Sequence, residues 1–192
     1  MRKTLLATAV GAVLSLSACS DNTAPTQQAN QAAPAATAEV TVTNPFFKKS
    51  TLPFEAPNCA EIKDDHFLPA FEEGMKQHMA EIEAIANNPE PATFENTFVA
   101  MEKSGELLTR VSRVFYNLTG TDSNEQRRQI QSELAPKMAA HSDNINLNPT
   151  LFARVESVYN ARNDLGLDAE SLRLVEVYYE RIVRSGAKLN DE

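Results

Sequence analysis

From residue 66 onwards, apolar residues recur every three or four positions, which is the spacing that places them on one face of an α-helix. The first such run begins at His66 and has Pro69 in its first turn, where a proline is tolerated. It stops before Pro89, because the residue that precedes a proline is pushed out of the helical region. We expect this helix to bury a stripe made of Phe71, Met75, His78, Ile82 and Ile85.

A second, longer run predicts a helix capped by Thr93. Its apolar face extends over about seven turns to Leu118, and Gly105 stands at one of the apolar positions. A glycine there allows a neighbouring helix to approach closely, although it lowers helix propensity by about 1 kcal/mol. The sequence therefore predicts one helix with a close contact at Gly105. The expected stripe is Phe94, Phe98, Met101, Leu108, Val111, Phe115 and Leu118.

Three further helices are predicted from residues that favour helix starts. Asp122 with Glu125 resembles a capping box, Pro149 opens the next helix, and Asp168 caps the last, which ends at Ser185-Gly186. Since strand-like alternation is nowhere convincing, we predict an all-α fold, an antiparallel bundle of about five helices with short loops. The expected inward positions are Ile130, Leu134, Met138 and His141, then Phe152, Val155 and Val158 or Tyr159, and finally Leu174 or Val175, Tyr178 and Ile182.

Residues 1–18 have the features of an export signal. Arg2 and Lys3 precede an apolar stretch that is too short for a ~30 Å hydrocarbon core, which takes about 20 helical residues. The stretch ends in Leu16-Ser17-Ala18-Cys19, which resembles a bacterial lipobox and implies that Cys19 is lipidated and anchors the chain to a membrane. The alternative is an ordinary small-residue cleavage site. Because Ser20 and not Asp follows Cys19, we expect the periplasmic face of the outer membrane, within the cell envelope.

The remainder divides into three segments. Residues 19–43 are rich in Ala, Gln, Thr, Asn and Pro and lack aromatic residues, so we expect a disordered tether. Residues 44–64 place several Phe, Leu and Ile residues between prolines, which indicates an extended arm that packs on another element. Residues 65–192 form the predicted helical domain.

Composition excludes several classes of protein. The 192 residues carry 18 Lys+Arg against 26 Asp+Glu, a formal net charge of −8, which argues against a nucleic-acid partner. With 6 Gly and no Trp, the chain suits helices better than a turn-rich sheet. The 2 Cys cannot form a disulfide-rich scaffold, and Cys59 is the only thiol left if Cys19 is lipidated.

A search for catalytic groups yields no recognisable apparatus. The 3 His, at positions 66, 78 and 141, do not form His-Glu-x-x-His, and core-edge hydrogen-bonded histidines are favoured over a three-histidine zinc site. The acidic pairs Asp64-Asp65 and Glu72-Glu73 are interpreted as solvated helix starts. Tyr178-Tyr179 is expected to place one ring inward and the other outward, where it could serve an interface.

Six short strings nevertheless occur in the order found in one peptidase family. Together they resemble the N-terminal part of the thimet oligopeptidase family of zinc metallopeptidases, in its bacterial dipeptidyl carboxypeptidase branch, over about residues 44 to 192. The strings are Asn44-Pro45-Phe46-Phe47 with Leu52-Pro53-Phe54 and Ala56-Pro57, His66-Phe67-Leu68-Pro69-Ala70-Phe71-Glu72, Pro91-Ala92-Thr93-Phe94-Glu95-Asn96-Thr97, Gly105-Glu106-Leu107-Leu108-Thr109-Arg110-Val111, Leu147-Asn148-Pro149 with Leu151-Phe152, and Arg181-Ile182-Val183-Arg184-Ser185-Gly186-Ala187.

The resemblance implies a mostly helical peptidase whose two halves enclose a channel and which removes dipeptides from the C-termini of oligopeptides. One zinc would be held by His-Glu-x-x-His and a later glutamate, and the matched N-terminal helices would wall the channel. None of these catalytic or metal-binding residues occurs in this chain, so no residue is assigned to catalysis or to zinc. Cys59 departs from the family, which favours an aromatic or aliphatic residue there.

The expected function is therefore the N-terminal channel wall of a lipid-anchored, zinc-dependent dipeptidyl carboxypeptidase, inactive by itself. On this hypothesis the chain is a piece of a longer protein or the product of an interrupted gene. The alternative is a free-standing helical lipoprotein that binds a peptide or a protein partner without catalysis. A third hypothesis is that a separate polypeptide supplies the catalytic half.

Overall fold

The computed structural model describes residues 44–189. The expected signal, the tether and Cys19 lie outside them. Regular structure in this part of the chain is entirely helical, which confirms the predicted all-α class. The helices are α1 (Phe67–Ala86), α2 (Ala100–Lys103), α3 (Glu106–Thr121), α4 (Glu125–Asn146), α5 (Pro149–Ala161) and α6 (Ala169–Arg184), with a π-helical segment at Phe94–Val99 and 3₁₀ turns at Pro45–Phe47, Pro53–Glu55 and Asp64–His66.

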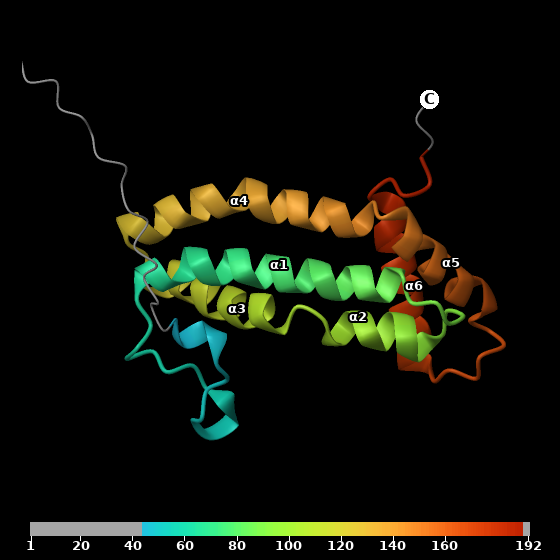
Figure 1. Cartoon of the computed structure of the whole chain (residues 1–192), viewed down its shortest axis with the longest axis horizontal. Helices are drawn as coiled ribbons and strands as arrows, with labels where there is room; N and C mark the ends of the chain where they lie inside the picture. The colour runs from blue at the N-terminus through green and yellow to red at the C-terminus, as the bar shows by residue number, and fades with distance from the viewer. Residues whose placement is uncertain (1–43, 190–192) are drawn as a thin grey trace, which may run out of the picture. The chain divides into compact units, whose positions relative to one another are not determined.

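Helix α1 is the central element of this arrangement. It packs against α3 and α4, and the three run side by side, with the consecutive helices α3 and α4 antiparallel (Figure 1). Helices α5 and α6 pack on each other and cross the end of this group, so the bundle is not uniformly aligned (Figure 1). Within the described residues, none of the helices has the length and apolarity needed to span a membrane.

The predicted second helix is interrupted, which the sequence pattern did not show. Helix α2 ends at Lys103, Ser104 is extended, and Gly105 has φ 71°, in the left-handed region that favours glycine. Helix α3 then begins at Glu106. The prediction of one helix from Thr93 to Leu118 is therefore wrong at this point, because the two apolar stripes on either side of the break keep nearly the same phase and conceal it.

The close approach predicted at Gly105 exists, but its partner is a side chain. A Cβ atom at Gly105 would lie 3.0 Å from the ring of His78 on α1. The tight contact between two helices occurs instead at Gly74, where a Cβ would lie 3.0 Å from the backbone of Leu108. Gly74 therefore sets the distance between α1 and α3.

Most predicted helix ends agree with the structure, with one exception. Thr93 caps the π-helical segment, Pro149 opens α5, and Asp168 caps α6 by accepting from Ser171 N–H. The capping box at Asp122 is wrong: Asn124 caps α4. Asp122 instead follows the last turn of α3 and binds Arg127.

Two hydrophobic cores share α1. The first core joins the arm to α1, α3 and the first half of α4, and consists of Phe46, Phe67, Ala70, Phe71, Leu107, Leu108, Val111, Phe115, Ile130 and Leu134. The second core joins the end of α1 to the π-helical segment, α2, α5 and α6, and consists of Ile82, Ala86, Phe98, Met101, Leu151, Val155, Val158, Val175 and Ile182. Of the alternatives left open by the sequence, Val158 and Val175 are thus the buried residues.

Candidate functional site

A cleft of about 1070 Å³ lies between the arm, residues 44–64, and the outer face of α3. The start of the arm is fixed to the first core. Asn44 donates to the carbonyl oxygen of His66 at 2.7 Å, and the centroid of the Phe46 ring lies 5.5 Å from that of Phe67. Arg110 of α3 donates to the carbonyl oxygen of Phe46 at 2.9 Å. This wall of the cleft is therefore held by both backbone and side-chain contacts.

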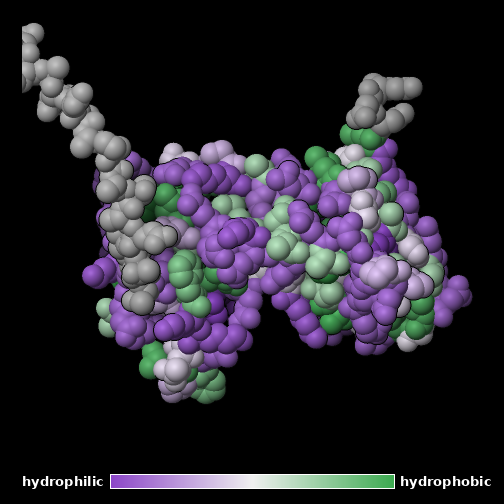
Figure 2. All heavy atoms as spheres, in the orientation of Figure 1, coloured by the Kyte–Doolittle hydropathy of each residue, from purple (hydrophilic) through white to green (hydrophobic). Residues whose placement is uncertain are grey.

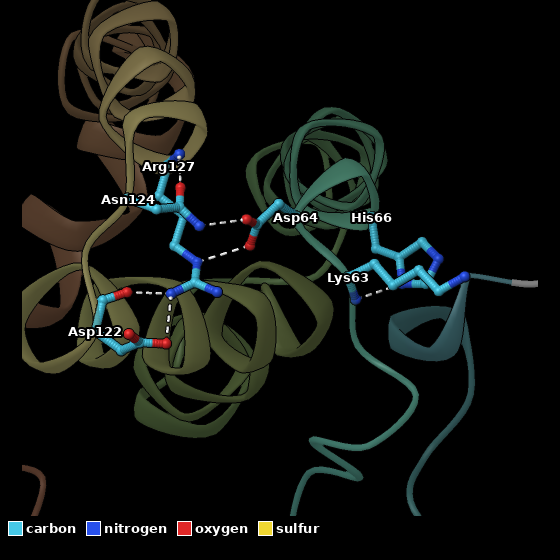
Figure 3. A network of polar contacts seen from close by, with 6 residues as sticks. All are labelled: Lys63, Asp64, His66, Asp122, Asn124 and Arg127. Carbon is cyan, nitrogen blue, oxygen red and sulfur yellow. Dashed lines mark hydrogen bonds and ion pairs between the residues drawn. The ribbon is translucent and has the colours of Figure 1, made fainter.

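The far end of the arm is fixed by a polar network (Figure 3). Asp64 accepts from the amide of Asn124 and from Nε of Arg127, both at 2.6 Å, and Arg127 also pairs with Asp122 at 3.1 Å. Burial raises the pKa of Asp64, but the hydrogen bonds from Asn124 and Arg127 outweigh it and hold this pKa below its usual value. The network joins the arm to the start of α4.

Between these two anchors the arm presents apolar side chains to solvent. Phe54 is 103% exposed and Phe47 is 48% exposed, and Figure 2 shows hydrophobic residues at the tip of this segment. Phe54 and Glu55 have φ values of 59° and 56°, a backbone conformation that non-glycine residues rarely adopt. Exposed aromatic rings on a strained turn are typical of a contact surface.

The α3 side of the cleft carries charge. Glu106 pairs with Lys49 of the arm at 2.9 Å and with Arg110 at 3.5 Å, and the hydrogen bond from Lys49 is the main reason why the pKa of Glu106 is lowered. Arg113 also lines the cleft and is exposed, and it makes no ion pair within the described residues. The exposed thiol of Cys59 lies in the cleft without a histidine beside it. The cleft thus combines charged side chains of α3 with exposed aromatic rings and an exposed thiol of the arm.

The structure separates the three histidines into two groups. His66 is buried beside the arm, where its Nδ1 accepts from Lys63 N–H at 3.0 Å. His78 Nδ1 and His141 Nε2 lie 3.0 Å apart, and His78 Nε2 lies 3.1 Å from Ser104 Oγ. The interpretation of His78 and His141 as hydrogen-bonded core-edge residues is confirmed. Residues 44–189 bring together no set of three His, Cys, Asp or Glu side chains able to hold a metal ion.

A second polar cluster lies under the Pro91–Thr97 string. The guanidinium of Arg154, which is 8% exposed, donates to the carbonyl oxygens of Asn88 and Glu90, both at 2.9 Å, and to Asn96 Oδ1 at 2.8 Å. Asn96 and Thr93 form a reciprocal capping box. Arg154 therefore holds the loop between α1 and the π-helical segment. Sequence reasoning missed this arginine because its partners are mainly backbone oxygens, which no residue pattern encodes.

The expectation of one outward tyrosine ring in Tyr178-Tyr179 is wrong. Tyr178 donates to a carboxylate oxygen of Glu102 and packs edge-on against Phe98 with ring centroids 5.8 Å apart. Burial and the hydrogen bond to Glu102 raise the pKa of the Tyr178 hydroxyl. Tyr179 stacks on Tyr159 at 3.7 Å. Both rings are half-buried because α6 packs against α5 on one side, and against the π-helical segment and Glu102 of α2 on the other.

Comparison with known proteins gives relatives that match most of the chain. No protein-family model matches it. It is 48% identical over 150 residues to the dipeptidyl carboxypeptidase of Escherichia coli (strain K12), and 47% identical over the same length to that of Salmonella typhimurium. Each match covers 78% of this chain and 22% of the relative.

A more distant match is oligopeptidase A of Salmonella typhimurium, at 23% identity over 124 residues, 65% of this chain and 17% of that protein. The chain spans about a fifth of the length of the dipeptidyl carboxypeptidases. By sequence, then, it is related to the N-terminal part of the bacterial dipeptidyl carboxypeptidases.

Proposed function

We propose that this chain forms the N-terminal wall of the peptide channel of a zinc-dependent dipeptidyl carboxypeptidase, which releases dipeptides from the C-termini of oligopeptides. The observation that carries this proposal is the 48% identity over 150 residues, which matches 78% of the chain to part of such an enzyme. Its role is to fold into a rigid wall and to contact the peptide.

The zinc required by this function would be held outside the described residues, since these supply no group of three ligands. No catalytic step is assigned to any side chain of this chain. On this proposal the chain by itself does not hydrolyse peptides.

The packing supports the role of a rigid wall. Helix α1 takes part in both cores, and the arm is fixed at one end by Asn44 and Phe46 and at the other by Asp64. A wall of this kind keeps its shape while a peptide moves along it, because its surface is positioned by buried side chains.

A chimera tests the proposal. In the Escherichia coli enzyme, the matched segment is replaced by residues 44–189, and release of dipeptide from an N-blocked tetrapeptide is measured. We expect kcat/KM within about tenfold of the parent, a loss of at most ~1.4 kcal/mol of transition-state stabilisation. A chimera that carries Gly74→Leu is the matched control and is expected to lose activity, because the added side chain would separate α1 from α3. A chimera that folds and binds zinc but releases no dipeptide would overturn the proposal.

The runner-up is a free-standing helical lipoprotein that binds a peptide or protein partner without catalysis. The observation that favours it is that both cores are complete: Phe71, Phe115 and Val155 are fully buried by neighbours within this chain. Fluorescence anisotropy of a labelled peptide with the chain alone separates the two. Binding by the chain alone together with an inactive chimera would establish the runner-up.

We further propose that the chain is anchored at the outer membrane through a lipid on Cys19, a proposal that rests on the resemblance of Leu16–Cys19 to a lipobox. Wild-type protein is expected to incorporate labelled palmitate and to sediment with outer-membrane vesicles. Cys19→Ala is expected to abolish both, and Cys59→Ala is the control that should leave both unchanged.

A further inference from the structure

The two hydrophobic cores are separated by a layer of polar side chains on α1, α4 and the Ser104–Gly105 break. His78 comes from α1 between Phe71 of the first core and Ile82 of the second. It contacts His141 of α4 on one side and Ser104 on the other. One residue beyond, Gly105 N–H donates to a carboxylate oxygen of Glu81 at 2.7 Å.

The hydrogen bonds fix the proton positions in this layer. Ser104 Oγ lies 2.7 Å from the carbonyl oxygen of Met101 and donates its single proton there. It must therefore accept from His78 Nε2–H, which leaves His78 Nδ1 as a bare acceptor. His141 Nε2–H is consequently the donor in the bond between the two rings. The chain of donors runs from His141 to His78 to Ser104 to Met101.

Acid protonates this series of hydrogen-bonded side chains in two steps. A first proton can bind His141 Nδ1 and leave all the hydrogen bonds of this series intact. A second proton has to bind His78 Nδ1, and two N–H groups on two cations would then face each other at 3.0 Å. The bond between α1 and α4 is thus compatible with one charge but not with two.

The surrounding charges do not relieve this conflict. On α1, the Glu81 carboxylate favours protonation of His78, but burial has the larger effect and lowers the pKa of His78. Burial, and then the charge of His78, lower the pKa of His141. On α4, Lys137 one turn before His141 is neutralised by Glu72 and Glu133 at 2.7 and 2.9 Å. On α2 and α3, Glu102 binds Tyr178 and Glu106 pairs with Lys49, which leaves Lys103 as a further positive charge.

We propose that His141, His78 and Ser104 form a pH-sensitive latch between the two cores, closed when the histidines are neutral and opened when both are protonated. Opening releases the C-terminal part of α4, which carries His141, and the Ser104–Gly105 break from α1. The first core stays intact, because none of the buried side chains that form it is titratable. The latch does not depend on the proposed peptidase function, since it requires only the described helices.

The test is amide hydrogen exchange by NMR at about pH 7 and about pH 5, each corrected for the intrinsic rate. Because an unfolded histidine titrates near pH 6.5 and the folded pKa values are lower, stability is complete above about pH 6.5 and falls below it. In wild type we expect protection of Gly105 and of amides near His141 to fall about tenfold or more at the acidic pH. Amides of α1 and α3 near Phe71 and Phe115 are expected to change less than about twofold.

Three variants complete the experiment. His141→Gln keeps a donor for His78 Nδ1 but removes one titrating group, so the local loss of protection in acid is expected to disappear. Ser104→Ala removes the acceptor for His78 Nε2. It disrupts the same series of hydrogen bonds at a second place if His141→Gln does not fold. His66→Gln, whose ring lies at the arm and outside the layer, is the control and should behave as wild type there. Equal loss of protection in both cores, or an unchanged acid response in His141→Gln, would overturn the proposal.

Discussion

The two cores on either side of the histidine layer are built from different side chains. The first is aromatic, with Phe115 edge-on to Phe67 at 5.0 Å and to Phe71 at 5.4 Å. In the second, the buried residues are largely aliphatic, with Val155 and Val175 fully buried, and most of its aromatic side chains are only partly buried at its edge. This core depends on Arg154 to hold the adjoining loop. The first core is thus stabilised by the packing of rings between regular helices, whereas the second requires polar contacts to position irregular backbone.

The largest effect is expected from breaking the aromatic core. Phe115→Ala removes the ring that contacts Phe67, Phe71 and Tyr116, and should lower the free energy of unfolding by about 3–5 kcal/mol. Urea unfolding followed by circular dichroism measures this change. A loss below about 1 kcal/mol would show that the first core collapses around the cavity and is not closely packed.

In the second core, the stability should depend most on the hydrogen bonds that Arg154 donates to the adjoining loop. Arg154→Leu leaves the carbonyl oxygens of Asn88 and Glu90 without their donor and should cost about 2–3 kcal/mol. Proteolysis should increase between residues 87 and 96. Val158→Ala, in the same core at a side chain that makes no hydrogen bond to the loop, is the control for simple cavity formation. If Val158→Ala increases proteolysis of this loop equally, Arg154 has no special role in holding it.

A substitution at the close contact between α1 and α3 should lower the stability nearly as much. Gly74→Ala places a Cβ 3.0 Å from the backbone of Leu108 and should cost about 1–3 kcal/mol. Gly120→Ala meets nothing within 4 Å and should be neutral or stabilising by up to about 1 kcal/mol. Thermal unfolding of the two variants in parallel checks whether their changes in stability have opposite signs. A neutral Gly74→Ala would indicate that α1 and α3 can move apart freely.

The smallest effect is expected at the arm. Asp64→Asn weakens the contacts with Asn124 and Arg127 and should cost about 1 kcal/mol. Because the folded pKa of Asp64 lies below its unfolded value, its contribution is complete above about pH 4 and is lost as the pH falls through the folded pKa. A urea series between about pH 6 and pH 3 should therefore show a shallower acid loss in Asp64→Asn than in wild type. Parallel curves would contradict the role of Asp64.

Periodicity predicted the regular helices because their stripes are local: Phe71, Ile82 and Phe115 are all buried as expected. It failed at Ser104–Gly105, where a break that keeps the apolar face in phase leaves no trace in the spacing. The contacts between His78 and His141, and between Arg154 and the loop at Asn88, join residues that are distant in the sequence. Such pairs depend on the packed arrangement, so no local pattern could have indicated them.

The contact between His78 and Gly105 also constrains how this sequence can change. The imidazole ring occupies the space that any side chain at position 105 would need, and the backbone there independently favours glycine. A smaller residue at position 78 would relieve only the first of these restrictions. In related sequences we therefore expect position 78 to vary while Gly105 is kept, and we expect a larger residue at position 105 only where position 78 has also changed and the break between α2 and α3 has been rebuilt.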